Sequence, residues 1–390
     1  MCGITGWISN KREIGHRIDI IENMTDSLKK RGPDSLGIYK TKNVLLGHRR
    51  LTIVDPEGGI QPMMKKIDDR EYTIVYNGEL YNTEEVRKNL KDRGHKFKSY
   101  SDTEVLLLSY IEWGEDCLNK INGIFAFCIW DEKNKKAFLA RDQLGVKPLF
   151  YMDNGDSLIF ASEIKSILQH PDVDPIINQG GLLEIFGLGP SRALGSGVFK
   201  DIKEIPPAHR LVFDSRGMQI RKYWDLEAKP HLEDLDTTAE HVRELVVDAI
   251  ERQLISDVPI CTFLSGGLDS SVISVVAANK LKRDGRGNLN TFSINYEDNE
   301  KYFTANEFQP DSDKYWIDRV SSHIGSNHQK IVLNNIELAE ALGPAVLARD
   351  LPGMADIDSS LYLFCNEVRK KATVALSGEC ADESVIIGLN

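Results

Sequence analysis

The chain has 390 residues, of which 41% are hydrophobic and 27% are charged, and its formal net charge is −11. Such a length and composition are typical of a globular protein with two domains. The negative charge argues against a nucleic-acid partner, because a phosphate backbone favours a basic surface. No apolar stretch approaches the length of a membrane span, and the first residues lack the basic start and long apolar core of a signal peptide.

The cysteine pattern indicates a reducing compartment. Neither a C-x-x-C motif nor metal-ligand spacing occurs among the six cysteines, which are Cys2, Cys117, Cys128, Cys261, Cys365 and Cys380. In a chain of this length the pattern favours reduced thiols over a disulfide framework. We therefore expect a cytoplasmic protein that binds neither membrane nor nucleic acid.

The first half of the chain alternates short apolar runs with Gly and Asn turns. Strands are expected at 44–46, 72–76, 124–130, 137–141 and 158–161, and helices at 18–31, 83–93 and 101–113. Ser101 is the expected N-cap of the last helix, and Glu104 is expected to complete a capping box with it. The pattern predicts an antiparallel α+β domain over residues 1–225.

The composition becomes acidic and polar at 227–236, so we interpret residues 226–236 as a linker and 237–390 as a second domain. There strands alternate with helices, which indicates βαβ units on a parallel sheet. Strands are expected at 260–264, 291–294, 329–333 and 373–376. Helices are expected at 237–255, 270–282 and 312–325, in a segment that runs through residue 346, and at 361–371.

Cys2 directly follows the initiator Met1. Removal of Met1 would leave a free α-amine beside the thiol, and an amine with a pKa of roughly 7.7–8.0 can deprotonate it. A small buried residue at the start of a strand is the other interpretation. For Cys2 taken alone that interpretation is favoured.

Further motifs shift the balance: Arg31-Gly-Pro-Asp34, His48-Arg-Arg-Leu-Thr-Ile-Val-Asp55, Tyr76-Asn-Gly-Glu-Leu-Tyr-Asn82 and Tyr100-Ser-Asp-Thr-Glu104. Each alone has a plain explanation, namely a sharp turn, a surface arginine pair, an Asn-Gly hairpin and a capping box. Together with 141–151 and 161–165, they closely resemble the class II glutamine amidotransferases over residues 2–225. The asparagine synthetase branch is the nearest match, and the resemblance implies an N-terminal-nucleophile sandwich.

The resemblance also implies roles for residues of this domain. The Cys2 thiolate would attack the side-chain amide of glutamine, and the side chain of Asn77 and the backbone N–H of Gly78 would stabilise the oxyanion. Arg50 would bind the α-carboxylate, and Glu79 and Asp102 the α-ammonium. The remaining substrate-binding residues would be Leu51, Thr52, Ile53 and Val54. The products would be glutamate and ammonia.

The second domain contains the loop Ser265-Gly-Gly-Leu-Asp-Ser-Ser271 between an apolar strand and an apolar helix. Glycines let a backbone approach phosphate oxygens, and a helix N-terminus favours anions. A plain glycine turn is the alternative, and the motif is neither a dinucleotide fingerprint nor a Walker A loop. It resembles the pyrophosphate loop of enzymes that adenylate a substrate, which implies an α/β domain of the adenine nucleotide hydrolase-like type.

Leu376-Ser-Gly-Glu-Cys-Ala-Asp-Glu383 resembles the second signature of the same family. By resemblance Leu264 and Ile294 would flank adenine, and Glu379 would be a base for the attack of ammonia. Asp269 and Asp382 would bind Mg²⁺. The other ATP-binding residues would be Ser265, Gly266, Gly267, Ser270, Ser377 and Gly378. Residues 351–360 resemble the loop on the aspartate side.

The sequence thus predicts glutamine-dependent asparagine synthesis, in which ATP activates aspartate as β-aspartyl-AMP and ammonia displaces AMP. The alternatives are an amidotransferase with another acceptor, and a glutaminase or regulatory relic without synthetase activity. Because residues 384–390 depart from the family pattern and are too short for a covering helix, we expect glutamine hydrolysis with little asparagine synthesis. The resemblance also favours a homodimer.

Overall fold

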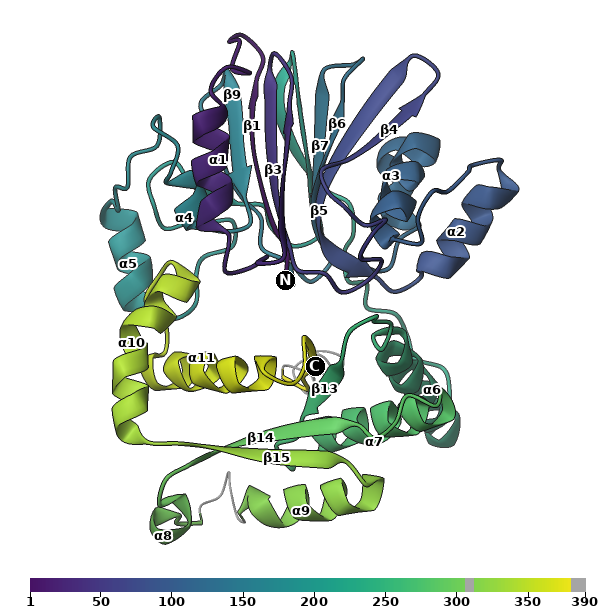
Figure 1. Cartoon of the computed structure of the whole chain (residues 1–390), viewed down its shortest axis with the longest axis vertical. Coiled ribbons are helices and arrows are strands. Elements are labelled where there is room, and N and C mark those ends of the chain that lie inside the picture. The colour runs from purple at the N-terminus through teal and green to yellow at the C-terminus, as the bar shows by residue number, and fades with distance from the viewer. Residues whose placement is uncertain (306–311, 380–390) are drawn as a thin grey trace. The chain divides into compact units, whose positions relative to one another are not determined.

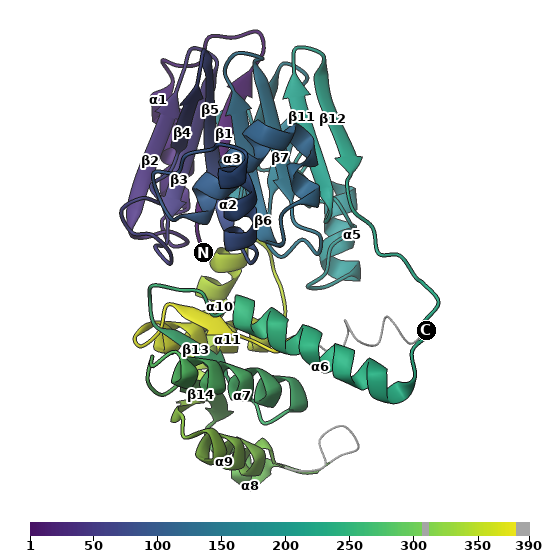
Figure 2. The ribbon, with the colours of Figure 1, turned by 90° about the vertical axis from the view of Figure 1, so that its right-hand side faces the viewer.

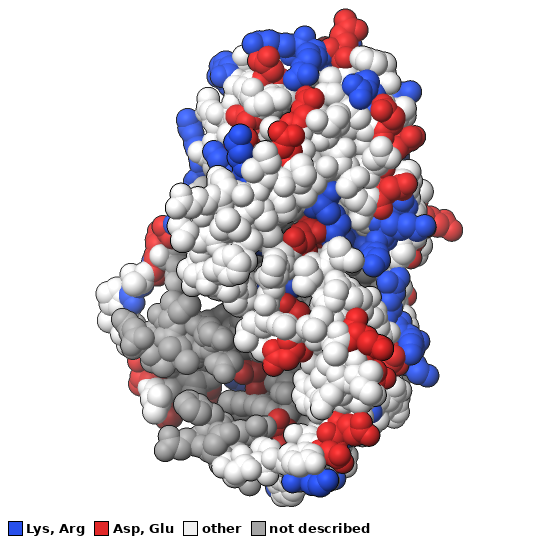
Figure 3. Space-filling model, turned by 90° about the vertical axis from the view of Figure 1, so that its left-hand side faces the viewer, with Lys and Arg blue, Asp and Glu red and all other residues white. Residues whose placement is uncertain are grey.

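The computed structural model describes residues 1–305 and 312–379. The chain divides into two compact units, Met1–Leu226 and Glu227–Asn390. Figure 3 shows one face on which Lys and Arg side chains are interspersed with Asp and Glu. Among the described residues, no helix combines the length and the apolar character needed to cross a membrane.

The first unit contains two six-stranded sheets whose strands pair antiparallel (Figure 1). The order in the first sheet is β10 (Lys203–Glu204), β8 (Phe150–Asp153), β9 (Ser157–Ala161), β1 (Gly3–Ser9), β3 (Val44–Arg50) and β2 (Ser35–Lys40). The order in the second is β12 (Gly217–Lys222), β11 (His209–Asp214), β7 (Lys136–Arg141), β6 (Gly123–Asp131), β5 (Arg70–Leu80) and β4 (Met63–Ile67). Figure 2 shows β11 and β12 at the edge of the second sheet.

The core of this unit lies between the two sheets. Ile4 and Leu46 from the first sheet pack with Val75 and Leu139 from the second, and all four are fully buried. Helices α1 (Ile18–Ser27) and α4 (Ile164–Ile167) contact the first sheet, and α2 (Thr83–Asp92), α3 (Asp102–Trp113) and the 3-10 helix η1 (Gly114–Asn119) lie by the second. Helix α5 (Gln179–Gly187) follows α4. The result is an α–β–β–α sandwich, which confirms the α+β class expected for this half.

The second unit contains a four-stranded parallel sheet. The order is β15 (Asn327–Leu333), β14 (Asn290–Tyr296), β13 (Ile260–Phe263) and β16 (Val374–Leu376). Its helices are α6 (Leu235–Arg252), α7 (Leu268–Arg283), α8 (Asn299–Tyr302), α9 (Asp313–Ile324), α10 (Asn335–Arg349) and α11 (Ala355–Arg369). Helices α6 and α7 pack on one cluster of sheet residues and α11 on another, so this half is α/β as expected.

Two expected helices have different bounds. Helix α1 ends at Ser27 instead of residue 31. The N–H groups of residues 28, 29 and 31 donate to the third preceding residue, and Arg31 reaches the carbonyl oxygen of Cys2. Helix α11 begins at Ala355, so most of the segment expected as a loop at 351–360 is helical. Asp356 and Asp358 in its first turn favour a helix start there.

The expected capping box is wrong. Ser101 does cap α3, but its hydroxyl accepts from the N–H of Thr103, not from that of Glu104. The Glu104 carboxylate accepts from the N–H groups of Lys98 and Ser99 instead. The reason is tertiary, since the N–H of Ser101 already donates to Asp55.

Candidate functional site

Cys2 lies immediately before β1, beside the end of β3. The N–H of Leu51 donates to its Sγ across 3.4 Å, and Sγ lies 3.6 Å from the carbonyl oxygen of Leu51. Burial raises the pKa of the Cys2 thiol, whereas the Leu51 N–H and the positive charges of the N-terminus and Arg50 oppose that rise. The α-amine in this structure belongs to Met1, and it lies 3.5 Å from the carbonyl oxygen of Arg31.

Two motifs to which no role was assigned, the turn at 31–34 and the segment 161–165, together hold the backbone of Cys2. Arg31, from the Arg-Gly-Pro-Asp turn, donates from Nε to the carbonyl oxygen of Cys2 across 2.9 Å. Its Nη1 forms a 2.9 Å ion pair with Glu163, which also contacts Lys165 at 2.7 Å. A Cβ at Gly32 would lie 2.3 Å from the carbonyl carbon and oxygen of Arg49, so glycine is required at that turn. Arg31 therefore holds the backbone of Cys2, and Glu163 in turn orients Arg31.

Arg50 ends β3 and is buried. Its guanidinium donates to the carbonyl oxygens of Val54, Asp55 and Pro56 at 3.1, 2.6 and 2.7 Å. At most two of its five N–H groups remain for a carboxylate. The expected substrate-binding residues Leu51, Thr52, Ile53 and Val54 form the loop that surrounds it, and Thr52 is anchored by its N–H to Asp34 at 2.7 Å.

Asn77 and Gly78 lie inside β5, so the hairpin interpretation of this Asn-Gly pair is wrong. Asn77 is 1% exposed, and among the described residues its Nδ2 has no hydrogen-bond partner. A buried donor without a partner carries a cost of about 1–3 kcal/mol, which a bound acceptor would remove. A Cβ at Gly78 would lie 2.3 Å from the carbonyl oxygen of Ile124, so no larger residue fits.

Glu79 and Asp102 form the acidic part of this site. Tyr76 donates its hydroxyl to Asp102 Oδ2 across 2.8 Å, and the N–H of Leu80 donates to the same oxygen across 3.1 Å. Burial, followed by the charge of Asp102, raises the pKa of Glu79 to about 7. Burial also raises the pKa of Asp102. Two carboxylates in one buried place favour a cation between them.

Sequence reasoning assigned no role to His48 and Lys147, although both lie in quoted motifs. His48 on β3 shares a 3.1 Å hydrogen bond with the carbonyl oxygen of Tyr76 on β5, and burial lowers its pKa to about 3, so its ring is neutral. The buried Lys147 has its Nζ 3.2 Å from Met1 Sδ. Burial lowers the pKa of Lys147, and the charge of Glu79 opposes this. No local pattern distinguishes either residue from a surface one.

The second unit contains a cavity of about 800 Å³ beside β13, β14 and β16. The expected nucleotide residues that line it are Leu264, Ser265, Gly267, Asp269, Ser270, Ile294, Ser377, Gly378 and Glu379. Gly266 does not line it, but its φ of 91° and a Cβ position 2.9 Å from the carbonyl oxygen of Asp313 require glycine. Asp382 lies outside the described residues.

Ser270 organises the first loop of this cavity. Its Oγ accepts from the N–H of Ser265 at 3.2 Å, lies 3.0 Å from Ser265 Oγ and donates to the carbonyl oxygen of Gly267 at 3.2 Å. Within the described residues, a Cβ at Gly267 would contact only Ser265 Oγ, at 3.6 Å, so open space adjoins this glycine. A Cβ at Gly378 would lie 2.9 Å from that of Asp269, which shows that the two signatures pack together.

The cavity lies where the sheet's connections change direction. From β13 the chain adds β14 and β15 on one side, and β16 then pairs on the other side of β13. Open α/β sheets bind ligands outside the carboxyl ends of the strands at such a switch point. The loops after β13 and β16 are the two motifs singled out from the sequence.

The cavity is also lined by residues for which the sequence motifs predict no individual role. His328 on β15 contacts Thr291 Oγ1 through Nδ1 at 2.9 Å and Ser293 Oγ through Nε2 at 3.1 Å, and burial lowers its pKa. Lys330 also lines the cavity. Ser360, from the segment expected as the aspartate-side loop, lines it from α11 and accepts a 3.0 Å hydrogen bond from Tyr296.

Comparison with known proteins gives matches to both units. Residues 1–224 match a family model described as a glutamine amidotransferase domain, and residues 241–388 match one described as asparagine synthase. The second match runs to residue 388, so the expected departure from the family pattern is wrong for most of residues 384–390.

Curated relatives agree with these matches. Asparagine synthetase (glutamine-hydrolysing) 3 of Bacillus subtilis (strain 168) is 54% identical over 98% of this chain and 62% of its own length. Asparagine synthetase 1 of the same organism is 33% identical over 98% of this chain and 58% of its own. A putative asparagine synthetase 2 of Methanocaldococcus jannaschii is 34% identical over 98% of this chain and 75% of its own.

The chain thus spans about three-fifths of the length of the two Bacillus relatives. The amidotransferase match covers more than half of the chain, and the archaeal relative is covered over three quarters of its length. The chain therefore belongs to the family of glutamine-hydrolysing asparagine synthetases.

Proposed function

We propose that this chain hydrolyses glutamine at Cys2 and uses ATP to convert aspartate into asparagine with the ammonia released. The observation that carries the first half is the buried Asn77 Nδ2, a donor without a partner among the described residues. Asn77 belongs to the same unit as Cys2, where the charge of Arg50 lowers the pKa of the Cys2 thiol and that of Asp102 raises it. Such a donor suits an oxyanion that forms only during the reaction.

The glutaminase half-reaction would begin after Met1 is removed. The Cys2 α-amine would accept the thiol proton, and the thiolate would attack the side-chain carbonyl carbon of glutamine. Asn77 Nδ2 and the N–H of Gly78 would stabilise the oxyanion. As the C–N bond breaks, ammonia would leave with a proton from the α-ammonium, and water would hydrolyse the remaining thioester to glutamate.

Arg50, Glu79 and Asp102 would hold the substrate's α-groups. The Arg50 guanidinium would meet the carboxylate with the N–H groups not used by the 54–56 loop. Glu79 and Asp102 would hold the ammonium, and its positive charge would favour ionisation of both carboxyls.

The synthetase half-reaction would take place in the second unit. The loop at 265–270 would hold the phosphates of ATP, and Leu264 and Ile294 would flank the adenine. The aspartate β-carboxylate would attack the α-phosphorus with loss of pyrophosphate, and ammonia would then displace AMP, with Glu379 accepting a proton.

Mg²⁺ is the metal that this site would use, since it prefers carboxylate and phosphate oxygens. Asp269 suits such an ion, because it carries a carboxylate and lines the cavity near the open space at Gly267. Asp382 is the second proposed ligand. Bound Mg²⁺ would neutralise phosphate charge.

The test measures pyrophosphate and glutamate on one sample of the chain with ATP, Mg²⁺ and glutamine, with and without aspartate. We expect aspartate-dependent pyrophosphate release matched by asparagine. This replaces the weak synthesis expected from residues 384–390, because the asparagine synthase match includes most of that segment. Release that needs another acceptor would indicate a different amidotransferase, and glutamate without pyrophosphate would indicate a glutaminase alone. Absence of glutamate formation would refute the role of Cys2.

We also propose a cytoplasmic homodimer. The five described cysteines are free thiols, which suits a reducing compartment. Light scattering on the purified chain would give the oligomeric state, and a monomeric mass at micromolar concentration would contradict the dimer.

A further inference from the structure

Asp55 contacts both ends of the proposed glutamine site, namely Arg50, proposed to bind the α-carboxylate, and the backbone next to Asp102, proposed to bind the α-ammonium. It is 3% exposed, and its φ of 51° lies in the left-handed region, which Asp and Asn tolerate better than other residues with a side chain. Its backbone carbonyl oxygen accepts from Arg50 Nη2 across 2.6 Å and from the N–H of Gly59 across 2.9 Å. Asp55 therefore belongs to the loop that holds Arg50.

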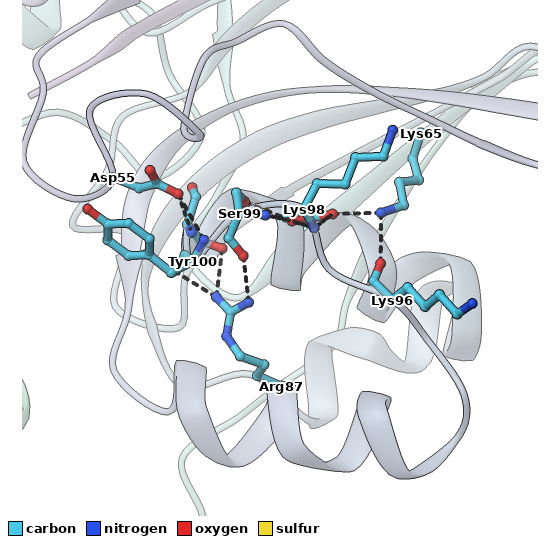
Figure 4. Close-up of polar contacts among 9 residues, drawn as sticks. Asp55, Lys65, Arg87, Lys96, Lys98, Ser99 and Tyr100 are labelled. Carbon is cyan, nitrogen blue, oxygen red and sulfur yellow. Dashed lines mark hydrogen bonds and ion pairs between the residues drawn. The ribbon is translucent and has the colours of Figure 1, made fainter.

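The carboxylate of Asp55 reaches the other end of the site. Its Oδ2 accepts from the N–H groups of Tyr100 and Ser101 at 2.9 and 3.1 Å (Figure 4). Its Oδ1 accepts from the N–H of Gly58 at 2.8 Å. Ser101 is the N-cap of α3, and Asp102 is the first residue of that helix. One residue thus connects the Arg50 loop to the start of the helix that carries Asp102.

The side chains of Glu104 and Arg87 hold the backbone of residues 98–101, the segment that leads into α3. Glu104 accepts from the N–H groups of Lys98 and Ser99 at 3.0 and 2.7 Å, so all four N–H groups of 98–101 donate to Asp55 or Glu104. Arg87 of α2 donates to the carbonyl oxygens of residues 99, 100 and 101 at 2.9, 2.7 and 3.2 Å (Figure 4). Because the four N–H groups and the three carbonyl oxygens of this segment are all paired, the network favours a single backbone conformation at 98–101.

A buried carboxylate is costly, and a loop that needs only stability does not require one. What Asp55 adds is a fixed connection between Arg50 and Asp102. We propose that Asp55 is a positioning residue that sets the spacing between these two groups, and so selects a free α-amino acid with both an α-carboxylate and an α-ammonium. This inference rests on the proposed glutaminase function.

The test is Asp55→Asn in the full chain. Asn has the same size and tolerates the left-handed backbone, but it lacks the charge and places an NH₂ group among N–H donors. Three amides are compared: L-glutamine, glutaric acid monoamide, which lacks the ammonium, and 4-aminobutanamide, which lacks the carboxylate. We expect kcat/KM for L-glutamine to fall about 10- to 100-fold, mainly through KM, and that for each one-ended amide by less than about 3-fold.

The matched control is Asp131→Asn. Asp131 is also 3% exposed, and its Oδ1 accepts from the N–H of Asn134 at 3.0 Å in the β6–β7 hairpin. Asp131→Asn should leave kcat/KM for all three amides unchanged. If circular dichroism shows that Asp55→Asn does not fold, Arg87→Lys replaces it, because a lysine cannot bind three carbonyl oxygens with a planar fork.

The pattern across the three amides decides the outcome. Equal losses for all of them, or no loss for L-glutamine, would overturn the proposal and assign Asp55 a structural role only. Wild-type chain that releases no ammonia from L-glutamine would instead refute the proposed function, and the inference with it.

Discussion

The hydroxyl of Tyr76 donates a 2.8 Å hydrogen bond to Oδ2 of Asp102, which joins β5 to the first residue of α3. Burial raises the pKa of Asp102, and this bond is the first of the contacts that oppose the rise. Tyr76 is 2% exposed, so no water can replace its hydroxyl without rearrangement. The Tyr76 hydroxyl, from the sheet on which α3 packs, therefore favours the ionised form of Asp102.

Tyr76→Phe is expected to weaken glutamine binding. A hydrogen bond to a charged group contributes about 1.5–3 kcal/mol, so KM for glutamine should rise roughly 10-fold or more while kcat falls less. Because the variant raises the pKa of Asp102 further, the acid limb of kcat/KM should move to higher pH. Steady-state kinetics across pH measure both effects, and an unchanged acid limb would contradict the role given to Asp102.

Cys2→Ala is expected to abolish glutamate formation, because no other group replaces the thiolate. Ammonia-dependent asparagine synthesis should continue, since free ammonia bypasses the first unit. The control is Cys117→Ala, which removes a buried thiol of the same unit and should keep glutaminase activity. Glutamate release by Cys2→Ala freed of contaminating glutaminases would disprove the assignment.

Arg50→Lys is expected to raise the glutamine KM by a larger factor than it lowers kcat, since it removes ground-state binding and the three bonds to the 54–56 loop. Arg49→Lys is the control. Arg49 contacts α1, where it pairs with Asp26 and donates from Nε to the carbonyl oxygen of Thr25 at 3.3 Å, so its replacement should affect stability more than glutamine binding. Similar kinetic effects at the two positions would mean that the wrong arginine has been chosen.

Glu79→Gln should make the chain more stable at pH 8 than the wild type. With a pKa of about 7 in the folded protein against 4.5 ordinarily, Glu79 holds its proton more tightly when folded. Wild-type stability therefore falls as pH rises from 4.5 to 7, and above pH 7 the loss is complete. Its size is at most about 3 kcal/mol.

Urea unfolding followed by tryptophan fluorescence measures this difference, because four of the five tryptophans lie in the first unit. The stability gain of Glu79→Gln over wild type should be present at about pH 8 and absent at about pH 4. The same variant should bind glutamine less tightly. A gain that does not change with pH would show that the ionisation of Glu79 is not its cause.

Ser270→Ala should lower kcat/KM for ATP about 10- to 100-fold without affecting glutamine hydrolysis. The hydroxyl of Ser270 contacts Ser265 and Gly267 and thereby shapes the loop that we propose holds phosphates. Ser271→Ala, which removes one 2.7 Å bond to the carbonyl oxygen of Gly267, is the milder control. Aspartate-dependent pyrophosphate release provides the measurement, and equal effects of the two variants would contradict this organisation.

The sequence alone determined the features that depend on neighbouring residues. The alternation of apolar and polar residues placed most strands, and the change to alternating strands and helices identified the second architecture. The glycine-rich loop at 265–271 and the N-terminal cysteine indicated their chemistry because backbone approach to phosphate and a free α-amine are local properties. The order of the parallel strands then brought two distant loops to one cavity.

Only the tertiary structure decided which groups face one another across layers. It placed Asn77 and Gly78 inside a strand instead of a turn, turned Glu104 toward Lys98 and Ser99, and gave Asp55 both Arg50 and the N–H groups before Asp102. These partners are distant in sequence or compete with local contacts. A helix or strand period tells which side of an element is buried, but the partner of a buried polar group depends on how the layers pack.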